Sequence, residues 1–270
     1  MLLNGFVDPK GWLHWCQLAD PARRVRKARP SELFVKKHLY SIVSAAGDKD
    51  PSIELGLAKL ESDAVPVVQK IIDAARSGYC PDLSLEEKRL WYLFFAMQWR
   101  RTPETQQAVA TDADILAMFD EAVARLHAAL PERRDEIAAL DTPEGRQRTL
   151  RNVRTETLAT FGVDVLKILE QRGITILRIT RPHKGFIIGS RAVVKLTVAG
   201  QSDLRNPTVE LWLPIASDIA VGAGRGKGTI TLLELADQNP IRQLNLAIAS
   251  QSRIIAGASA ALIRSLAFDR

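Results

Sequence analysis

The stretch "ITILRIT", residues 174–180, decides the fold of this chain of 270 residues. It is rich in the β-branched residues Ile and Thr, a composition typical of a strand. Before it, from about residue 31 to 172, apolar residues recur at helical spacing. After it, up to about residue 235, short β-rich runs such as "TVELWLPI" and "GTITLLEL" are separated by Gly, Pro, Asn or Asp. The chain therefore changes from helix to sheet at Ile174.

The two ends of the chain complete this order. "GWLHWCQL", residues 11–18, predicts an N-terminal strand or hairpin, and helices return over about residues 240–268. The order predicts an α+β fold: the N-terminal strand or hairpin, a helical body, an antiparallel sheet of about four to six strands, and closing C-terminal helices. We expect a single domain over residues 1–270, because the sheet has an apolar face that the helices would cover.

Two long helices are predicted in the helical body. Asp50 and Pro51 are suited to the start of the first, and Pro66 should kink or split it. Ser84 and Glu87 form a capping box at the start of the second. This second helix is apolar nearly all round over its aromatic stretch, so we expect it at the centre of the fold.

The stretch "QWRRTPETQ", residues 98–106, has two interpretations. Arg100 and Arg101 would end the aromatic helix, where cations oppose the helix dipole, while Thr102 would cap the next helix and Pro103 begin it. Alternatively, a guanidinium beside a helix N-terminus would hold an oxyanion or phosphate.

Composition narrows the possible classes of protein. Lys plus Arg is 37 and Asp plus Glu is 31, giving a net charge of +6 that mildly favours nucleic acid or another polyanion as a partner. Cys16 and Cys80 form no zinc pattern, and with no secretory leader they suggest the cytoplasm. No segment approaches the roughly 20 apolar residues that span a bilayer, so no membrane association is expected.

Most catalytic motifs are missing from the sequence. The glycine cluster of residues 221–229 does not fit a phosphate-binding loop, because Gly222 is one residue too close to Gly226. The histidines have no helical metal-binding spacing and no Gly-x-Ser-x-Gly elbow occurs, so no metal site is predicted and the cofactor stays open. Carboxylates remain: Glu61 lies close to the apolar seam of its helix, needs a cation if buried, and has Arg101 as its predicted partner.

Seven segments, in order, resemble the bacterial family of proteins of unknown function DUF4238. They are "LLNGFVDPKGWLHWCQ", "LFVKKHLYS", "LAKLESDAVPVVQKII", "FFAMQWRRTPE", "FIIGSRAVV", "LWLPIASDIAV" and "IRQLNLAIASQSR". The resemblance implies an α+β protein of bacterial context and brings no assigned activity. The polar positions that match the family's motifs are Glu61, Arg101, Thr102, Pro103, Asn245 and Gln251.

The chain departs from the family pattern in two places. A His-x-x-Pro pattern precedes the family's opening segment, but here Met1 comes too late to include it, so either the true start lies upstream or this member has lost it. Ser190, Arg191 and Ala192 stand where the family has Asp, a variable residue and Pro. Both departures weaken the case for an active enzyme.

Three functions remain open. The preferred one is a helix-braced structural or interaction protein, with a degenerate member of the family as one form of it. The second is an enzyme on a phosphodiester or other anionic substrate, with Glu61 as acid or base and Arg101 as anion clamp. Its site would also hold the binding residues Arg100, Thr102, Ser190, Asn245 and Gln251. The third is a non-catalytic nucleic-acid-binding module that uses the arginines of residues 23–29 or 148–154.

Overall fold

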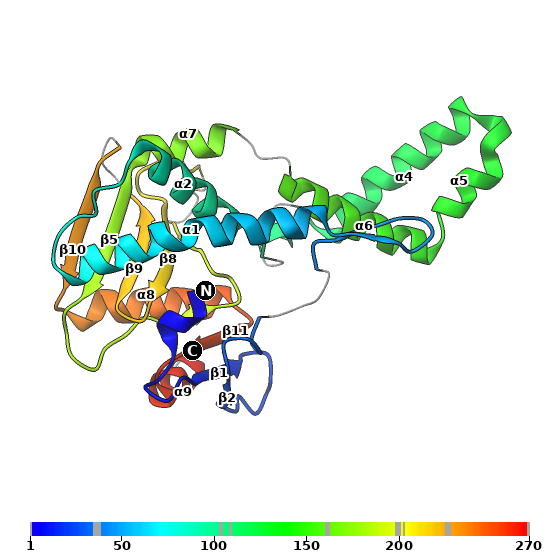
Figure 1. The fold of residues 1–270 in the computed structure, drawn as a ribbon. Helices are drawn as coiled ribbons and strands as arrows, with labels where there is room; N and C mark the ends of the chain where they lie inside the picture. The colour runs from blue at the N-terminus through cyan, green and yellow to red at the C-terminus, as the bar shows by residue number, and fades with distance from the viewer. Residues whose placement is uncertain are drawn as a thin grey trace. The chain divides into compact units, whose positions relative to one another are not determined.

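A computed structural model describes residues 2–34, 39–102, 105–107, 110–159, 163–197, 201, 203–224 and 228–268. The fold is α+β, as predicted. The chain divides into two compact units, each made of separate stretches of sequence. Figure 1 colours the chain by residue number. Unit 1 holds residues 1–35, 60–102 and 162–270, and unit 2 holds residues 36–59 and 103–161. That the whole chain behaves as one domain stays a prediction.

The helices of unit 1 begin with α1 (Ser52–Arg76), whose first residues, up to Lys59, belong to unit 2. Asp50 accepts a hydrogen bond from the Ser52 amide at its start, and the helix continues through Pro66 instead of splitting. The predicted capping box of Ser84 and Glu87 opens α2 (Leu85–Arg100). The aromatic side chains Trp91, Tyr92, Phe94 and Phe95 of α2 are buried, as expected, and α7 (Val163–Arg172) follows later in the chain.

A five-stranded sheet has the order β10-β5-β9-β8-β7. Its strands are β5 (Ile174–Ile179), β7 (Val194–Leu196), β8 (Glu210–Ala216), β9 (Ile219–Ala223) and β10 (Ile230–Leu235). The pairs are antiparallel, as predicted, except that β10 lies parallel to β5. Residues 225–227, in the glycine cluster, lie outside the described part of the chain.

A four-stranded sheet, also in unit 1, has the order β2-β1-β11-β6. It contains β1 (Leu13–Gln17), β2 (Arg26–Ala28), β6 (Ile188–Gly189) and β11 (Ile254–Gly257). Around it lie η1 (Leu2–Phe6), α8 (Gln238–Gln251) and α9 (Ala260–Phe268). The segment predicted as closing helices thus contains a strand, because Ile255 and Ala256 pair with β1 on one side and β6 on the other.

The core of this part of unit 1 joins the sheet to both closing helices. Fully buried side chains from η1, β1, α8, β11 and α9 form one cluster: Phe6, Leu13, Ile248, Ile255 and Ile263. Among the described residues, no helix combines the length and the apolar character that a membrane span requires.

Unit 2 consists of a small hairpin and a group of helices. Its elements are β3 (Ile42–Val43), β4 (Lys49–Asp50), α4 (Asp112–Ala129), η2 (Pro131–Arg133), α5 (Arg134–Leu140) and α6 (Pro143–Ala159). The hairpin corrects the predicted helical start near residue 31, since no α-helix occurs among the described residues between 31 and 51. Gly47, at a φ of 90°, adopts the left-handed conformation that its turn requires.

Candidate functional site

The predicted partners Glu61 and Arg101 meet in the structure. Arg101 caps the C-terminus of α2, and its Nη1 donates a hydrogen bond to Oε1 of Glu61 on α1. Gln98 Nε2 donates to the same oxygen at 3.3 Å. The side chains of Arg101 and Glu61 are 27% and 37% exposed, so this ion pair is partly solvated. Glu61 was expected at an apolar seam, and it lies at the edge of one.

Around this pair, α2 ends in polar residues that are more buried. Gln98 is 2% exposed, and its Oε1 has no hydrogen-bond partner among the described residues. Burial lowers the pKa of Arg100, and Thr102 is buried. Pro103 and Glu104 lie outside the described residues, so the role of Thr102 as a helix cap stays a prediction.

This geometry favours a brace between α1 and α2. The guanidinium of Arg101 is already held by a carboxylate, so an incoming anion would have to compete with Glu61. The main expected effect of removing either partner is therefore on the contact between the two helices, and not on the binding of an anion.

A double-mutant cycle measures this brace. We expect Glu61→Ala, Arg101→Ala and the double variant to give a coupling energy of about 0.5–1 kcal/mol, because partly solvated ion pairs are screened by water. Urea unfolding followed by circular dichroism provides the free energies of unfolding. A coupling of zero would mean that the pair does not stabilise the fold.

The other predicted residues form a second group, around α8. Asn245 uses both ends of its carboxamide: Nδ2 donates to the Gly185 carbonyl at 2.8 Å, and Oδ1 accepts from the Ile187 amide at 3.0 Å. Gln251 holds Lys195 in the same way, at 2.8 Å to its carbonyl and 3.1 Å to its amide. Each carboxamide thus gives backbone amide and carbonyl groups the hydrogen bonds that a neighbouring strand would otherwise provide.

Ser190 belongs to this second group. Its hydroxyl accepts hydrogen bonds from the amides of Arg253 at 3.0 Å and Ile254 at 3.4 Å, and its own amide donates to the Ile254 carbonyl. Ser190 thereby fixes the end of β6 against the start of β11. The predicted residues thus fall into two groups, one at the junction of α1 and α2 and one around α8.

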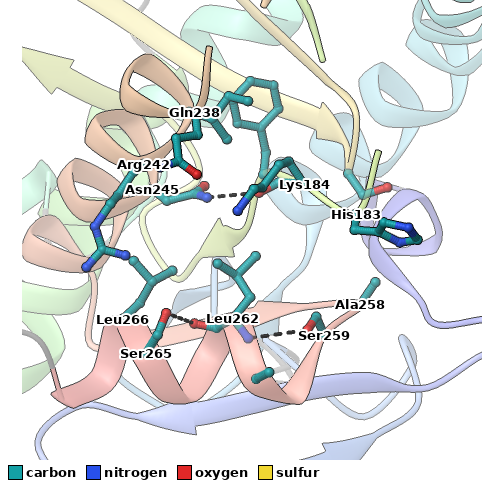
Figure 2. A pocket seen from close by; sticks show the side chains of 15 residues that line it. His183, Lys184, Gln238, Arg242, Asn245, Ala258, Ser259, Leu262, Ser265 and Leu266 are labelled. Carbon is teal, nitrogen blue, oxygen red and sulfur yellow. Dashed lines mark hydrogen bonds between the residues drawn. The ribbon is translucent and has the colours of Figure 1, made fainter. Parts of the chain in front are cut away.

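A cavity of about 700 Å³ adjoins the second group (Figure 2). Its walls are α8, α9 and the segment of residues 183–186, with Asn245 at the point where α8 holds that segment. The lining includes the cations Lys184 and Arg242 and the imidazole of His183, and no carboxylate occurs among the described residues that line it. The apolar lining includes Phe186, Ile241, Leu262 and Leu266.

The 183–186 segment is held in a defined conformation. Phe186 is 1% exposed, and its amide donates to the Ser217 carbonyl at 2.7 Å. A Cβ at Gly185 would lie 3.1 Å from that carbonyl oxygen, a tight contact that glycine avoids. His183 adopts a φ of 62°, which is uncommon for a residue with a side chain. These contacts fix the backbone that carries His183 and Lys184 at the cavity rim.

Sequence reasoning missed His183, Lys184 and Arg242 as site residues. They come from two segments about sixty positions apart, and no motif joins them. Of the predicted residues, Asn245 lines the cavity, and it matches a motif of the family. Its carboxamide lines the cavity but is occupied by the backbone of residues 185 and 187.

The arginine clusters suggested for nucleic acid make intramolecular contacts. Arg29 lies 3.7 Å over the ring of Trp12 and donates to the carbonyls of Lys10 and Gly11. In unit 2, Arg154 pairs with Asp112 at 2.6 Å. Of these clusters, Arg29 and Arg154 are therefore already engaged within the protein.

Thiols and metal-binding groups give no additional site in the described part of the chain. Cys16 is buried and Cys80 is exposed, and both are free. The described residues contain no group of three or more His, Cys, Asp or Glu side chains that could hold a metal ion.

Comparison with known proteins gives one match. The model of a family described as "Protein of unknown function (DUF4238)" matches residues 1–253. No curated protein and no solved structure matches the chain.

Proposed function

Because this chain belongs to the DUF4238 family, whose members are described as proteins of unknown function, we propose a function from the geometry of the chain itself: it binds a small anionic ligand. The family match confirms the resemblance in the sequence. The site is the cavity between α8, α9 and residues 183–186. One observation carries the proposal. Lys184 and Arg242 line this cavity together with His183, and its described lining contains no Asp or Glu side chain.

The size and lining of the cavity support a small molecule with an apolar part. Its volume of about 700 Å³ lies within the range of roughly 300–1,000 Å³ that is usual for such sites. Lys184 and Arg242 would attract the anionic group, while Ile241, Leu262 and Leu266 would cover the apolar body. Ser259 and Ser265 add hydroxyl groups on the α9 side (Figure 2).

This proposal differs from the function preferred from the sequence, a helix-braced structural or interaction protein. Glu61 and Arg101 brace α1 and α2 within it. The enzyme alternative built on these two residues has less support, because Arg101 is already paired with Glu61. The nucleic-acid alternative has less support because Arg29 and Arg154 are engaged within the protein.

The test compares anions with uncharged molecules of the same shape. We expect octanoate and phenyl phosphate to raise the melting temperature at low salt, and octanol and phenol to raise it less, because the cations select charge. In the double variant Lys184→Ala/Arg242→Ala, the affinity for the better anion should fall at least about tenfold. Thermal shift screening followed by titration calorimetry measures both effects.

Arg264→Ala is the matched control. Arg264 is exposed on α9 and lies outside the cavity lining. Its substitution removes one positive charge, as each substitution in the double variant does, but leaves the cavity unchanged. An equal loss of affinity in Arg264→Ala would indicate a general charge effect. No preference for the anions over octanol and phenol would refute the proposed function.

A further inference from the structure

Strand β10 forms one edge of the five-stranded sheet. It pairs with β5 over six residues, from Ile230 opposite Ile174 to Leu235 opposite Ile179, and the described residues place no strand on its other side (Figure 1). An edge of this length presents backbone amides and carbonyls that another strand could bind.

The hydrogen bonds to β5 identify which residues of β10 face outward. The Ile174 amide donates to the Thr229 carbonyl, and the Thr180 amide donates to the Leu235 carbonyl. Alternate residues of a parallel strand bond to the same neighbour, so residues 229, 231, 233 and 235 face β5. Leu232 and Glu234 therefore direct their amides and carbonyls to the free edge. Ile230 does so too, and its carbonyl accepts from Cys80 Sγ at 3.6 Å.

Apart from the contact of Cys80 with the Ile230 carbonyl at one end, common protections of an edge strand are missing from β10. Its sequence, "ITLLEL", contains no lysine and no proline, and its register with β5 has no bulge. Its single charge, Glu234, is neutralised by Arg178 of β5 at 3.1 Å. Leu233 is 51% exposed at this edge, and its neighbours in the same row, Leu177 and Leu235, pack against the core.

We propose that β10 pairs antiparallel with β10 of a second copy of this chain, with Leu233 on the two-fold axis. In this register Leu232 of one protomer lies opposite Glu234 of its partner, and the outward backbone groups of both residues form four hydrogen bonds across the two strands. Leu233 meets its own copy at a non-hydrogen-bonded position, where side chains approach most closely. The contact between Cys80 and Ile230 stays intact.

The charges also suit this pairing. The two Glu234 carboxylates come from diagonal positions, which lie about 7–8 Å apart in antiparallel strands, and each has its own Arg178. The same surface thus serves both protomers, as a two-fold dimer requires. This inference is independent of the anion-binding cavity.

Disulfide trapping tests the register. In a Cys80→Ser background, Leu233→Cys should form a covalent dimer under mild oxidation, since Cα atoms at a non-hydrogen-bonded pair lie about 4.5 Å apart, within disulfide range. Thr231→Cys is the matched control: Thr231 is also exposed and lies on the same face, but its copy lies four residues out of register. It should cross-link at least about tenfold more slowly, because the thiols meet only by collision.

Sedimentation of the untagged chain tests the association itself. We expect a concentration-dependent dimer, and Leu233→Lys should weaken it at least about tenfold, because two like charges would meet on the axis. The far-ultraviolet circular dichroism of Leu233→Lys checks that the variant folds. A monomer at all concentrations, a dimer unaffected by Leu233→Lys, or equal cross-linking of the two cysteine variants would each overturn the proposal.

Discussion

Asn245→Ala is expected to lower the free energy of unfolding by about 2–4 kcal/mol, since a buried polar group left unpaired costs roughly 1–3 kcal/mol. Asn245 is 2% exposed, and its carboxamide satisfies the Ile187 amide and the Gly185 carbonyl at once. Ile187 is fully buried, so water cannot easily replace the lost acceptor. Urea unfolding followed by circular dichroism measures the change.

Two further variants isolate the role of the carboxamide. Gln243 lies exposed on the same helix, so Gln243→Ala should change stability by less than about 0.5 kcal/mol. Asn245→Asp keeps an acceptor for Ile187 but places a second oxygen against the Gly185 carbonyl and buries a carboxylate in place of a neutral amide, so at neutral pH it should lose at least as much stability as Asn245→Ala. If Asn245→Ala were as stable as Gln243→Ala, the carboxamide would not hold the 183–186 segment.

Gly222→Val is expected to lower the free energy of unfolding by about 3 kcal/mol, as overpacking of a filled core does. Gly222 lies on β9 directly opposite Trp212 of β8, and a Cβ there would come within 2.5 Å of both the Leu211 carbonyl oxygen and the Trp212 ring. The carbonyl belongs to the backbone of a central strand, so it cannot move aside without disturbing the sheet. Thermal unfolding measures the effect.

Gly56→Ala provides the opposite control. Gly56 lies in α1, and a Cβ at this position would have no atom within 4 Å. Alanine should therefore raise stability by about 0.5–1 kcal/mol, because glycine loses more backbone entropy in a helix. A destabilised Gly56→Ala, or a Gly222→Val that unfolds like the wild type, would contradict the packing described for these two positions.

The local part of the fold could be predicted from the sequence. The Ser84–Glu87 capping box, the buried aromatic face of α2 and the change to strands at Ile174 all depend on neighbours within a few positions. The Glu61–Arg101 contact was also predictable. A carboxylate close to the apolar seam of its helix needs a cation if buried, and Arg101, at the end of the aromatic helix, was the predicted partner.

Features set by distant pairing could not be predicted in this way. Strand β11 has only four residues, too few to interrupt the helical pattern around it, and its conformation depends on β1 and β6. The parallel pairing of β10 with β5 joins two strands that are more than fifty residues apart, so no local pattern indicates it. The cavity has the same origin, since Lys184, Arg242 and Ser259 come together only after α8 and α9 have packed.

The division of the chain into two units has a practical consequence for recombinant fragments. The polypeptide enters unit 2 after residue 35, leaves it after 59, enters again after 102 and leaves after 161. No uninterrupted fragment can therefore encode unit 1 without unit 2. Shortening the gene from either end removes β1 or α9 from the same core, so a stable minimal fragment has to be sought by internal deletion.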